Sequence, residues 1–269
     1  MTARVAWPAV PALVLLLVFF LFPVVRMLGF SVEAGTFEWY AKALGEGLYL
    51  GVYWNTFEIA LLVTGICLLL GYPLGFLIAT TTPAWATAGF IFVLLPLWTS
   101  VLVRTYAWMV LLGRNGVFNR WLIDAGIIAD PLPLLHNFTG VLIGMVHVLL
   151  PYMVLPIYGA VRRLDPAVVA AAEGLGASNW RIFWRIHLPL TLNGIFAGSV
   201  LVFVLSLGFF ITPALLGGGR VIMIAVLIEQ EVRQTLNWPF AAALSAVLLA
   251  FTLAVYALAQ RFTRTEAHS

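Results

Sequence analysis

Charged residues are scarce in this sequence. They make up 9% of its 269 residues, whereas soluble domains average about 25%. Apolar residues make up 63% of the chain. A chain with so little charge cannot cover a folded surface in water with polar side chains. The composition therefore excludes a soluble globular protein and indicates a protein of the membrane.

Cysteine and catalytic motifs are also nearly absent. The single cysteine, Cys67, excludes an internal disulfide and any multi-cysteine metal site. No Walker motif, nucleophile elbow or HExxH motif is present, so we expect no catalytic residue, no bound metal, no cofactor and no ATP hydrolysis by this chain itself. The formal charge of +3 comes without basic and aromatic residues in alternation, so nucleic acid is not an expected partner.

Long uncharged runs are what the sequence does contain. The longest is Ile59–Val103, 45 residues that Thr80–Pro83 interrupts, so it predicts two helices. One helical span needs roughly 20 apolar residues. The runs are continuously apolar, whereas strands of a membrane barrel alternate between two faces. The sequence therefore predicts an all-α, polytopic membrane protein formed by a single transmembrane domain over residues 1–269. We expect six transmembrane helices, at about 7–30, 51–79, 85–112, 138–161, 190–212 and 239–261.

The distribution of arginine indicates the orientation. With the N-terminus in the cytoplasm, seven arginines face three acids inside, and six basic residues face seven acids outside. Four of the inside arginines lie in or next to one connection, between the fourth and fifth spans: Arg162, Arg163, Arg181 and Arg185. The excess of positive charge on cytoplasmic loops favours cytoplasmic N- and C-termini.

The connection at 165–189 is predicted to be a helical hairpin. Asp165 is a favourable N-cap and Pro166 suits the first helical position. Gly176 lies where a left-handed residue would end the first helix. Ser178 or Asn179 would cap the second. From helix chemistry alone, an amphipathic hairpin that anchors the chain to lipid headgroups explains this segment as well as a docking site does.

The spacing within the hairpin resembles the EAA loop of ABC-importer permeases. That pattern is Glu-Ala-Ala, three residues, Gly, nine residues, then Ile-x-Leu-Pro. Ala171 and Ala172 match the alanines, Gly176 matches the glycine, and Ile186-His187-Leu188-Pro189 matches the end. Ala170 stands in place of the family glutamate, and Glu173 follows three residues later, about 60° around an ideal helix. The resemblance implies that this cytoplasmic hairpin couples to an ATPase through Asp165, Ala170, Ala171, Ala172, Glu173, Gly176, Ala177 and Ser178.

Other segments resemble the spermidine/putrescine branch of that family. They are Leu95–Ser100, Val103–Trp108, Leu112–Val117, Gly144–Tyr152, Phe210–Gly218 and Asn237–Pro239. The resemblance implies a type I importer permease fold in the cytoplasmic (inner) membrane. It also implies a second homologous permease subunit, two ATPase subunits that bind the ATP, and an external substrate-binding protein. A polyamine such as putrescine or spermidine is the implied substrate, with an opine, an aminoalkylphosphonate or another small cation or zwitterion as alternatives.

Candidate residues for the substrate path or gate lie within the spans, most of them nearest the outer half. A charge inside an apolar span, such as Arg104, is a functional candidate by default, although snorkelling to the interface is the alternative. Trp108, four residues later, is placed to stack on Arg104. Glu58 is placed to attract an amine or to pair with Arg104. The complete candidate set is Glu58, Trp98, Arg104, Tyr106, Trp108 and Tyr152.

Two rival functions make their own demands on the sequence. A stand-alone secondary transporter or channel would need charged relay residues in several spans or inverted repeats. An intramembrane enzyme would need paired acids, a Ser/His set or metal ligands within the spans. His147 has no companion of that kind at usable spacing. The permease interpretation is therefore favoured over both.

Overall fold

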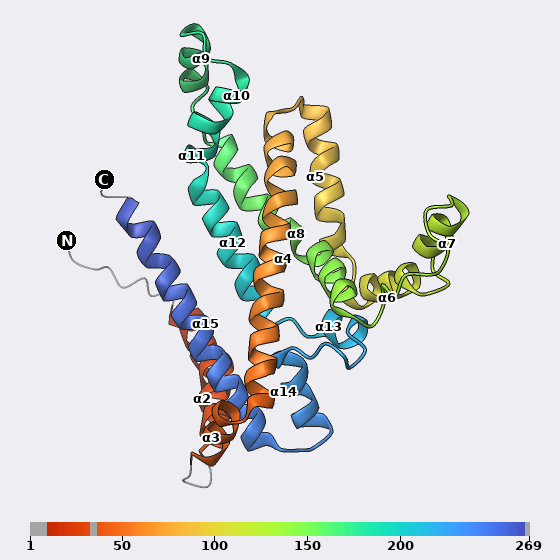
Figure 1. Ribbon diagram of the computed structural model, residues 1–269. Helices are drawn as coiled ribbons and strands as arrows, with labels where there is room; N and C mark the ends of the chain where they lie inside the picture. Colours follow the sequence, from red (N-terminus) through yellow and green to blue (C-terminus); the bar gives the residue numbers. More distant parts are fainter. Residues whose placement is uncertain (1–9, 33–36, 267–269) are drawn as a thin grey trace, which may run out of the picture. The chain divides into compact units, whose positions relative to one another are not determined.

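The computed structural model describes residues 10–32 and 37–266, and every regular element in these two ranges is helical (Figure 1). The first elements are α1 (Val10–Leu16), the π-helix η2 (Leu17–Leu21), α2 (Phe22–Phe30), α3 (Glu38–Gly45), α4 (Gly47–Thr80), α5 (Pro83–Trp98), α6 (Val101–Leu112) and α7 (Val117–Asp124). The later ones are α8 (Phe138–Arg162), α9 (Pro166–Gly174), α10 (Asn179–Ile182), the π-helix η3 (Phe183–His187), α11 (Leu188–Leu190), α12 (Leu192–Leu207), α13 (Ile211–Leu216), α14 (Ile224–Arg233) and α15 (Trp238–Glu266).

Four helical stretches within the described ranges are long and apolar enough to cross a bilayer. They are Val10–Phe30, Gly47–Thr80, Phe138–Arg162 and Trp238–Leu258, which match the first, second, fourth and sixth predicted spans. The other two predicted spans are bent pairs of helices, so the count rises to six only if each pair crosses the membrane once. Outside the described residues lie residues 7–9 of the first predicted span. The same holds for Arg4 and Glu33, two of the charged residues counted above for the orientation.

The prediction of one continuous helix over 85–112 is wrong. Helix α5 ends at Trp98, and Thr99 and Ser100 adopt extended backbone with ψ of 146° and 136°. The Thr99 hydroxyl donates to the Pro96 carbonyl at 2.9 Å, which satisfies an acceptor that the helix end leaves free. Beyond the break, Val101–Asp124 turns by 101° from the axis of α5 (Figure 1). Trp98 and Arg104 consequently lie on different helices.

The fifth predicted span, 190–212, begins within a few residues of the observed helix α12, but its predicted end is wrong. The segment Asn179–Leu190 bends by 59° into α12. At this bend the Thr191 hydroxyl donates to the His187 carbonyl at 2.7 Å. Helix α12 ends at Leu207, and a new short helix, α13, begins at Ile211. A hydroxyl that can replace a helix hydrogen bond allows such a bend inside an apolar stretch.

The chain divides into two compact units. The first contains the residues up to Gly51 and Leu227–Phe251. Its buried centre is Phe240, whose ring lies 5.6 Å from that of Trp39 and 5.0 Å from that of Tyr49. The Lys42 ammonium lies 4.7 Å from the centre of the Phe240 ring. This is a cation–π contact, which favours a cation close to apolar surface.

The second unit, Val52–Val226 with the residues from Thr252 on, is built around α8. Eleven residues of α8 are buried, including Met145, Leu149 and Met153. Helix α12 lies very close to α8. A Cβ added at Gly194 would lie only 2.5 Å from the Ala160 Cβ. Membrane helices associate through such small-residue contacts, since lipid provides no hydrophobic drive between them.

Helix α8 lies between two regions of this unit that contain predicted site residues. Its C-terminal end leads into α9 and α10, whereas α6 and α13 pack near its N-terminal half (Figure 1). The predicted coupling hairpin and Arg104 therefore lie toward opposite ends of α8.

Candidate coupling hairpin and transmembrane path

The start of the hairpin follows the sequence prediction. Asp165 has extended backbone, and its Oδ1 accepts a hydrogen bond from the Ala167 N–H at 2.9 Å. Pro166 occupies the first turn of α9. Together they begin the helix sharply after the end of α8, because the cap satisfies a free N–H and proline fixes the helical φ.

The turn of the hairpin is a Schellman motif centred on Gly176. The Gly176 N–H donates to the Glu173 carbonyl at 2.9 Å, and the Ala177 N–H donates to the Ala172 carbonyl at 3.0 Å. Gly176 has a φ of +80°, in the left-handed region that favours glycine. A Cβ there would meet nothing within 4 Å, so the requirement for glycine is one of backbone conformation, not of space.

One face of α9 is smooth and open. Ala170, Ala171 and Glu173 are exposed, as is Ser178 after the turn, and Ala172 and Ala177 are half-buried. Leu175 is 90% exposed at the tip, and sequence analysis did not select it. The sequence did indicate that this residue is exposed, because an apolar residue between two glycines in a loop is not expected to be buried in a core. A row of alanines ending in an exposed leucine offers another protein a close, apolar contact surface.

The second half of the hairpin packs against α4. Ile182 is buried, and the Phe183 ring lies 5.7 Å from that of Phe76 and 5.8 Å from that of Tyr72. The Trp180 and Trp184 rings are 5.5 Å apart, as two side chains four residues apart on one helical face can be. Ser178 precedes α10 without a side-chain cap bond, so that predicted role of Ser178 is wrong. The aromatic contacts provide a rigid link from the hairpin to a long helix.

Two hollows border the inner side of the hairpin. One, of about 500 Å³, has Val169, Glu173 and Trp180 among its walls. The other, of about 420 Å³, has Asp165, Ala170 and Glu173 among its walls. Ala170, which stands where the resembled pattern has glutamate, therefore adjoins open space. A longer side chain at position 170 has room to be accommodated.

The predicted path residues are only partly brought together. Arg104 of α6 is 9% exposed. It interacts electrostatically with two titratable neighbours on α8, Tyr152 and His147. Its Nε and Nη1 have no hydrogen-bond partner among the described residues. A buried cation without acceptors is costly, because the protein does not replace the lost hydration.

Trp108 bonds to α8 instead of stacking on Arg104. Its Nε1 donates to Nδ1 of His147 at 3.0 Å, and its ring is parallel to that of Phe118 at 6.2 Å. The predicted stacking of Trp108 on Arg104 is therefore wrong. Because His147 Nδ1 accepts, its imidazole carries a proton on Nε2. His147 therefore accepts a hydrogen bond from α6 through Nδ1 and keeps its Nε2–H as a donor.

Three further candidates lie apart from this contact. Glu58 on α4 is half-buried, and no ion pair joins it to Arg104 in the described part of the chain, so the expected pair is not formed. Trp98 is 85% exposed at the end of α5, and Tyr106 is 56% exposed on α6. These three side chains are available to a ligand or to a second subunit.

Thr105 and Thr212 are polar contacts that sequence analysis missed. Their hydroxyl oxygens are 3.1 Å apart and join α6 to α13. Both residues are almost fully buried. A threonine in an apolar helix was the available signal, but only the break before α6 brings its hydroxyl to α13.

Comparison with known proteins identifies the family. Residues 5–266 match the model of the family described as "Binding-protein-dependent transport system inner membrane component". The spermidine/putrescine transport system permease protein PotB of Haemophilus influenzae is 41% identical over 212 residues, which cover 78% of this chain and 74% of that protein. The PotB protein of Escherichia coli K12 is 34% identical over 229 residues, which cover 84% and 83% of the two chains.

Solved structures share the fold. A chain of a bacterial ABC transporter that imports the acidic polysaccharide alginate superimposes with a TM-score of 0.74, at 19% identity over 95% of this chain and 93% of that one. A chain of the MetNI methionine ABC transporter gives 0.62, at 13% identity over 82% and 98%. The family match spans nearly the whole sequence and agrees with the helical fold. This chain belongs to the inner membrane components of binding-protein-dependent transport systems, as a permease subunit of an ABC importer.

Proposed function

We propose that this permease subunit imports a polyamine, putrescine or spermidine. The observation that carries the proposal is the 41% identity, over 78% of the chain, to a permease named for spermidine and putrescine transport. A polyamine is a chain of ammonium groups separated by methylenes, which aromatic faces and carboxylates bind well. Trp98, Tyr106 and Glu58 offer such groups, because none of the three is fully buried.

The hairpin at 165–189 is the proposed contact with the ATPase. Its exposed alanine face and Leu175 provide an apolar surface, and the rings at Phe183 and Phe76 carry movement into α4. Ala170 removes one acidic anchor, so apolar contact contributes more of the binding free energy on this subunit. ATP is bound and hydrolysed by two partner subunits, and this chain holds no cofactor.

The remaining partners follow from the same proposal. A second homologous permease completes the path, and an external substrate-binding protein delivers the polyamine. Both termini lie in the cytoplasm, which places the arginine-rich hairpin beside the ATPases. Arg162, Arg163, Arg181 and Arg185 are all exposed, as cytoplasmic arginines at a membrane surface are.

Uptake by the reconstituted complex tests the proposal. Liposomes holding this subunit with its second permease and ATPases, and supplied with the binding protein, are expected to accumulate labelled putrescine or spermidine only when ATP is inside. Excess unlabelled polyamine should compete, and an acidic solute of similar size should not. If neither polyamine accumulates while an anionic solute does, the polyamine assignment fails and the permease role alone stands.

A further inference from the structure

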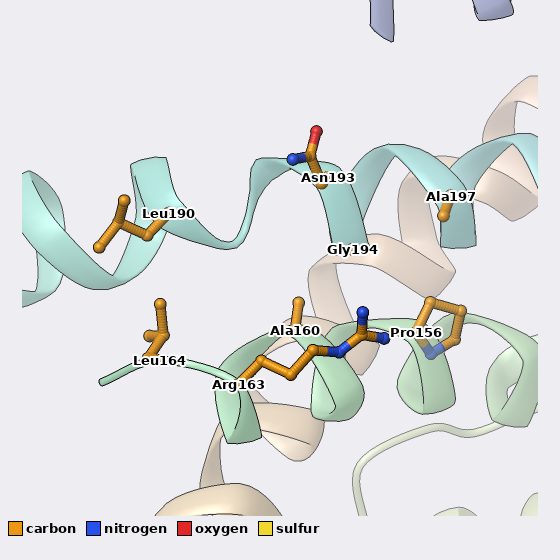
Figure 2. Close-up of a pocket in the computed structure, with 8 residues that line it drawn as sticks. All are labelled: Pro156, Ala160, Arg163, Leu164, Leu190, Asn193, Gly194 and Ala197. Atoms are coloured by element: carbon orange, nitrogen blue, oxygen red, sulfur yellow. The ribbon is translucent and has the colours of Figure 1, made fainter. Parts of the chain in front are cut away.

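A cavity of about 390 Å³ lies between the end of α8 and the start of α12 (Figure 2). It shares only Leu164 with the second hairpin hollow and none of its lining residues takes part in the Arg104 contact. Its lining residues are Pro156, Ala160, Arg163, Leu164, Leu190, Asn193, Gly194 and Ala197. Most of this lining is apolar, and it contains one charged side chain.

Arg163 is this charged residue. One hydrogen bond orients its side chain, and it makes no ion pair with a described residue. Its Nε donates to the Gly159 carbonyl at 3.1 Å, which holds the side chain along α8. Figure 2 shows the guanidinium in the space between α8 and α12. Its other two nitrogens have no protein acceptor among the described residues, and no carboxylate lines the cavity. Two donor groups of a fixed cation are therefore free to bind an anion.

The position of the cavity along α8 sets the depth of the site. At 1.5 Å per residue, the 25 residues of α8 extend about 37 Å, which exceeds a hydrocarbon core of about 30 Å. Pro156 and Ala160 belong to the last two turns of the helix, and Arg163 is the residue just past its end. The cavity therefore lies at the level of lipid headgroups, whichever side of the membrane this end faces.

We propose that the cavity binds the headgroup of an anionic phospholipid. The free guanidinium nitrogens of Arg163 donate to a phosphate oxygen in charge-assisted hydrogen bonds. The glycerol and the first methylenes lie on Pro156, Ala160 and Leu190, and Leu190 is itself 53% exposed. A basic pocket between transmembrane helices is a recognised form of headgroup site. Net charge favours an anionic lipid over a zwitterionic one, because no carboxylate of the cavity would hold a headgroup amine.

Native mass spectrometry of the purified complex tests this site. Complexes in detergent are titrated with phosphatidylglycerol or with phosphatidylethanolamine of the same acyl chains. Arg163→Gln is expected to lower affinity for phosphatidylglycerol about tenfold. Arg162→Gln is the matched control, because Arg162 is the preceding exposed arginine and lines a different cavity. It should retain wild-type affinity. Ala197→Leu keeps the arginine but narrows the cavity, and it should also weaken binding.

Several outcomes of the same titration would overturn the proposal. Equal loss in Arg163→Gln and Arg162→Gln would show general attraction to basic residues, and unchanged binding in both would show that the cavity is not used. Equal affinity for the two lipids would refute selection by charge. Displacement of the lipid by inorganic phosphate at equal concentration would identify the ligand as free phosphate. Circular dichroism confirms that each variant is folded before titration.

Discussion

Replacing Gly176 with valine is expected to reduce substrate-stimulated ATP hydrolysis by the assembled transporter at least about tenfold. Valine at a φ of +80° is strained by about 1–3 kcal/mol, because a β-branched side chain disfavours the left-handed region. The Schellman bonds of Gly176 and Ala177 depend on that conformation. Their loss would turn the alanine face of α9 away from its partner while leaving the membrane helices in place.

Two variants separate backbone strain from other effects at this turn. Gly176→Asn should retain most activity, because asparagine tolerates the left-handed region and the space beyond the Cα is open. Gly174→Ala lies in the helix itself, with no neighbour within 4 Å, and should be neutral or slightly stabilising. ATP hydrolysis and uptake are measured on the reconstituted complex. Wild-type coupling in a well-expressed Gly176→Val protein would contradict the role of the turn.

Replacing Arg104 with methionine is expected to stabilise the subunit and to impair transport. Methionine is shorter, flexible and uncharged, so it fills part of the space and removes two buried donors that lack acceptors. The free energy of unfolding of the isolated subunit should rise by about 1–3 kcal/mol. Uptake should fall, because a cation left without an acceptor here is available to bind one in another state of the transport cycle.

Stability in detergent and uptake in liposomes are measured on the same variants. Arg114→Met, at an exposed arginine beyond the end of α6, should change neither quantity. Glu58→Gln should leave the stability of the isolated subunit unchanged, because Glu58 makes no ion pair with Arg104 in this structure. A less stable Arg104→Met subunit would show that the arginine is structurally satisfied. Undiminished uptake would show that it has no part in transport.

The hairpin was predictable because its signals are local. The cap at Asp165, the proline after it and the left-handed glycine at 176 each act within one turn, and all three were found where the sequence predicted them. The long apolar helices α4 and α8 were predictable for a related reason, since composition alone decides whether a segment suits the bilayer.

The polar contacts inside the membrane were not predictable in the same way. The break at Thr99 and Ser100 interrupts an uncharged run in which no residue type requires an interruption. That break alone turns α6 by 101° from α5, so it decides which residues share a face with Arg104. The hydrogen bond from Trp108 to His147 depends on how α6 then packs on α8. The spacing of residues in the sequence does not determine that packing.

The coupling claim is tested most directly by cross-linking from the hairpin. In a Cys67→Ser background, Ala171→Cys places a thiol on the exposed face of α9, and Arg114→Cys places one at an exposed position after the end of α6. A short bifunctional reagent is applied to native membranes containing the whole transporter. We expect position 171 to be joined to the ATPase subunit and position 114 not to be. An ATPase cross-link from position 114 with none from position 171 would contradict both the orientation and the coupling role.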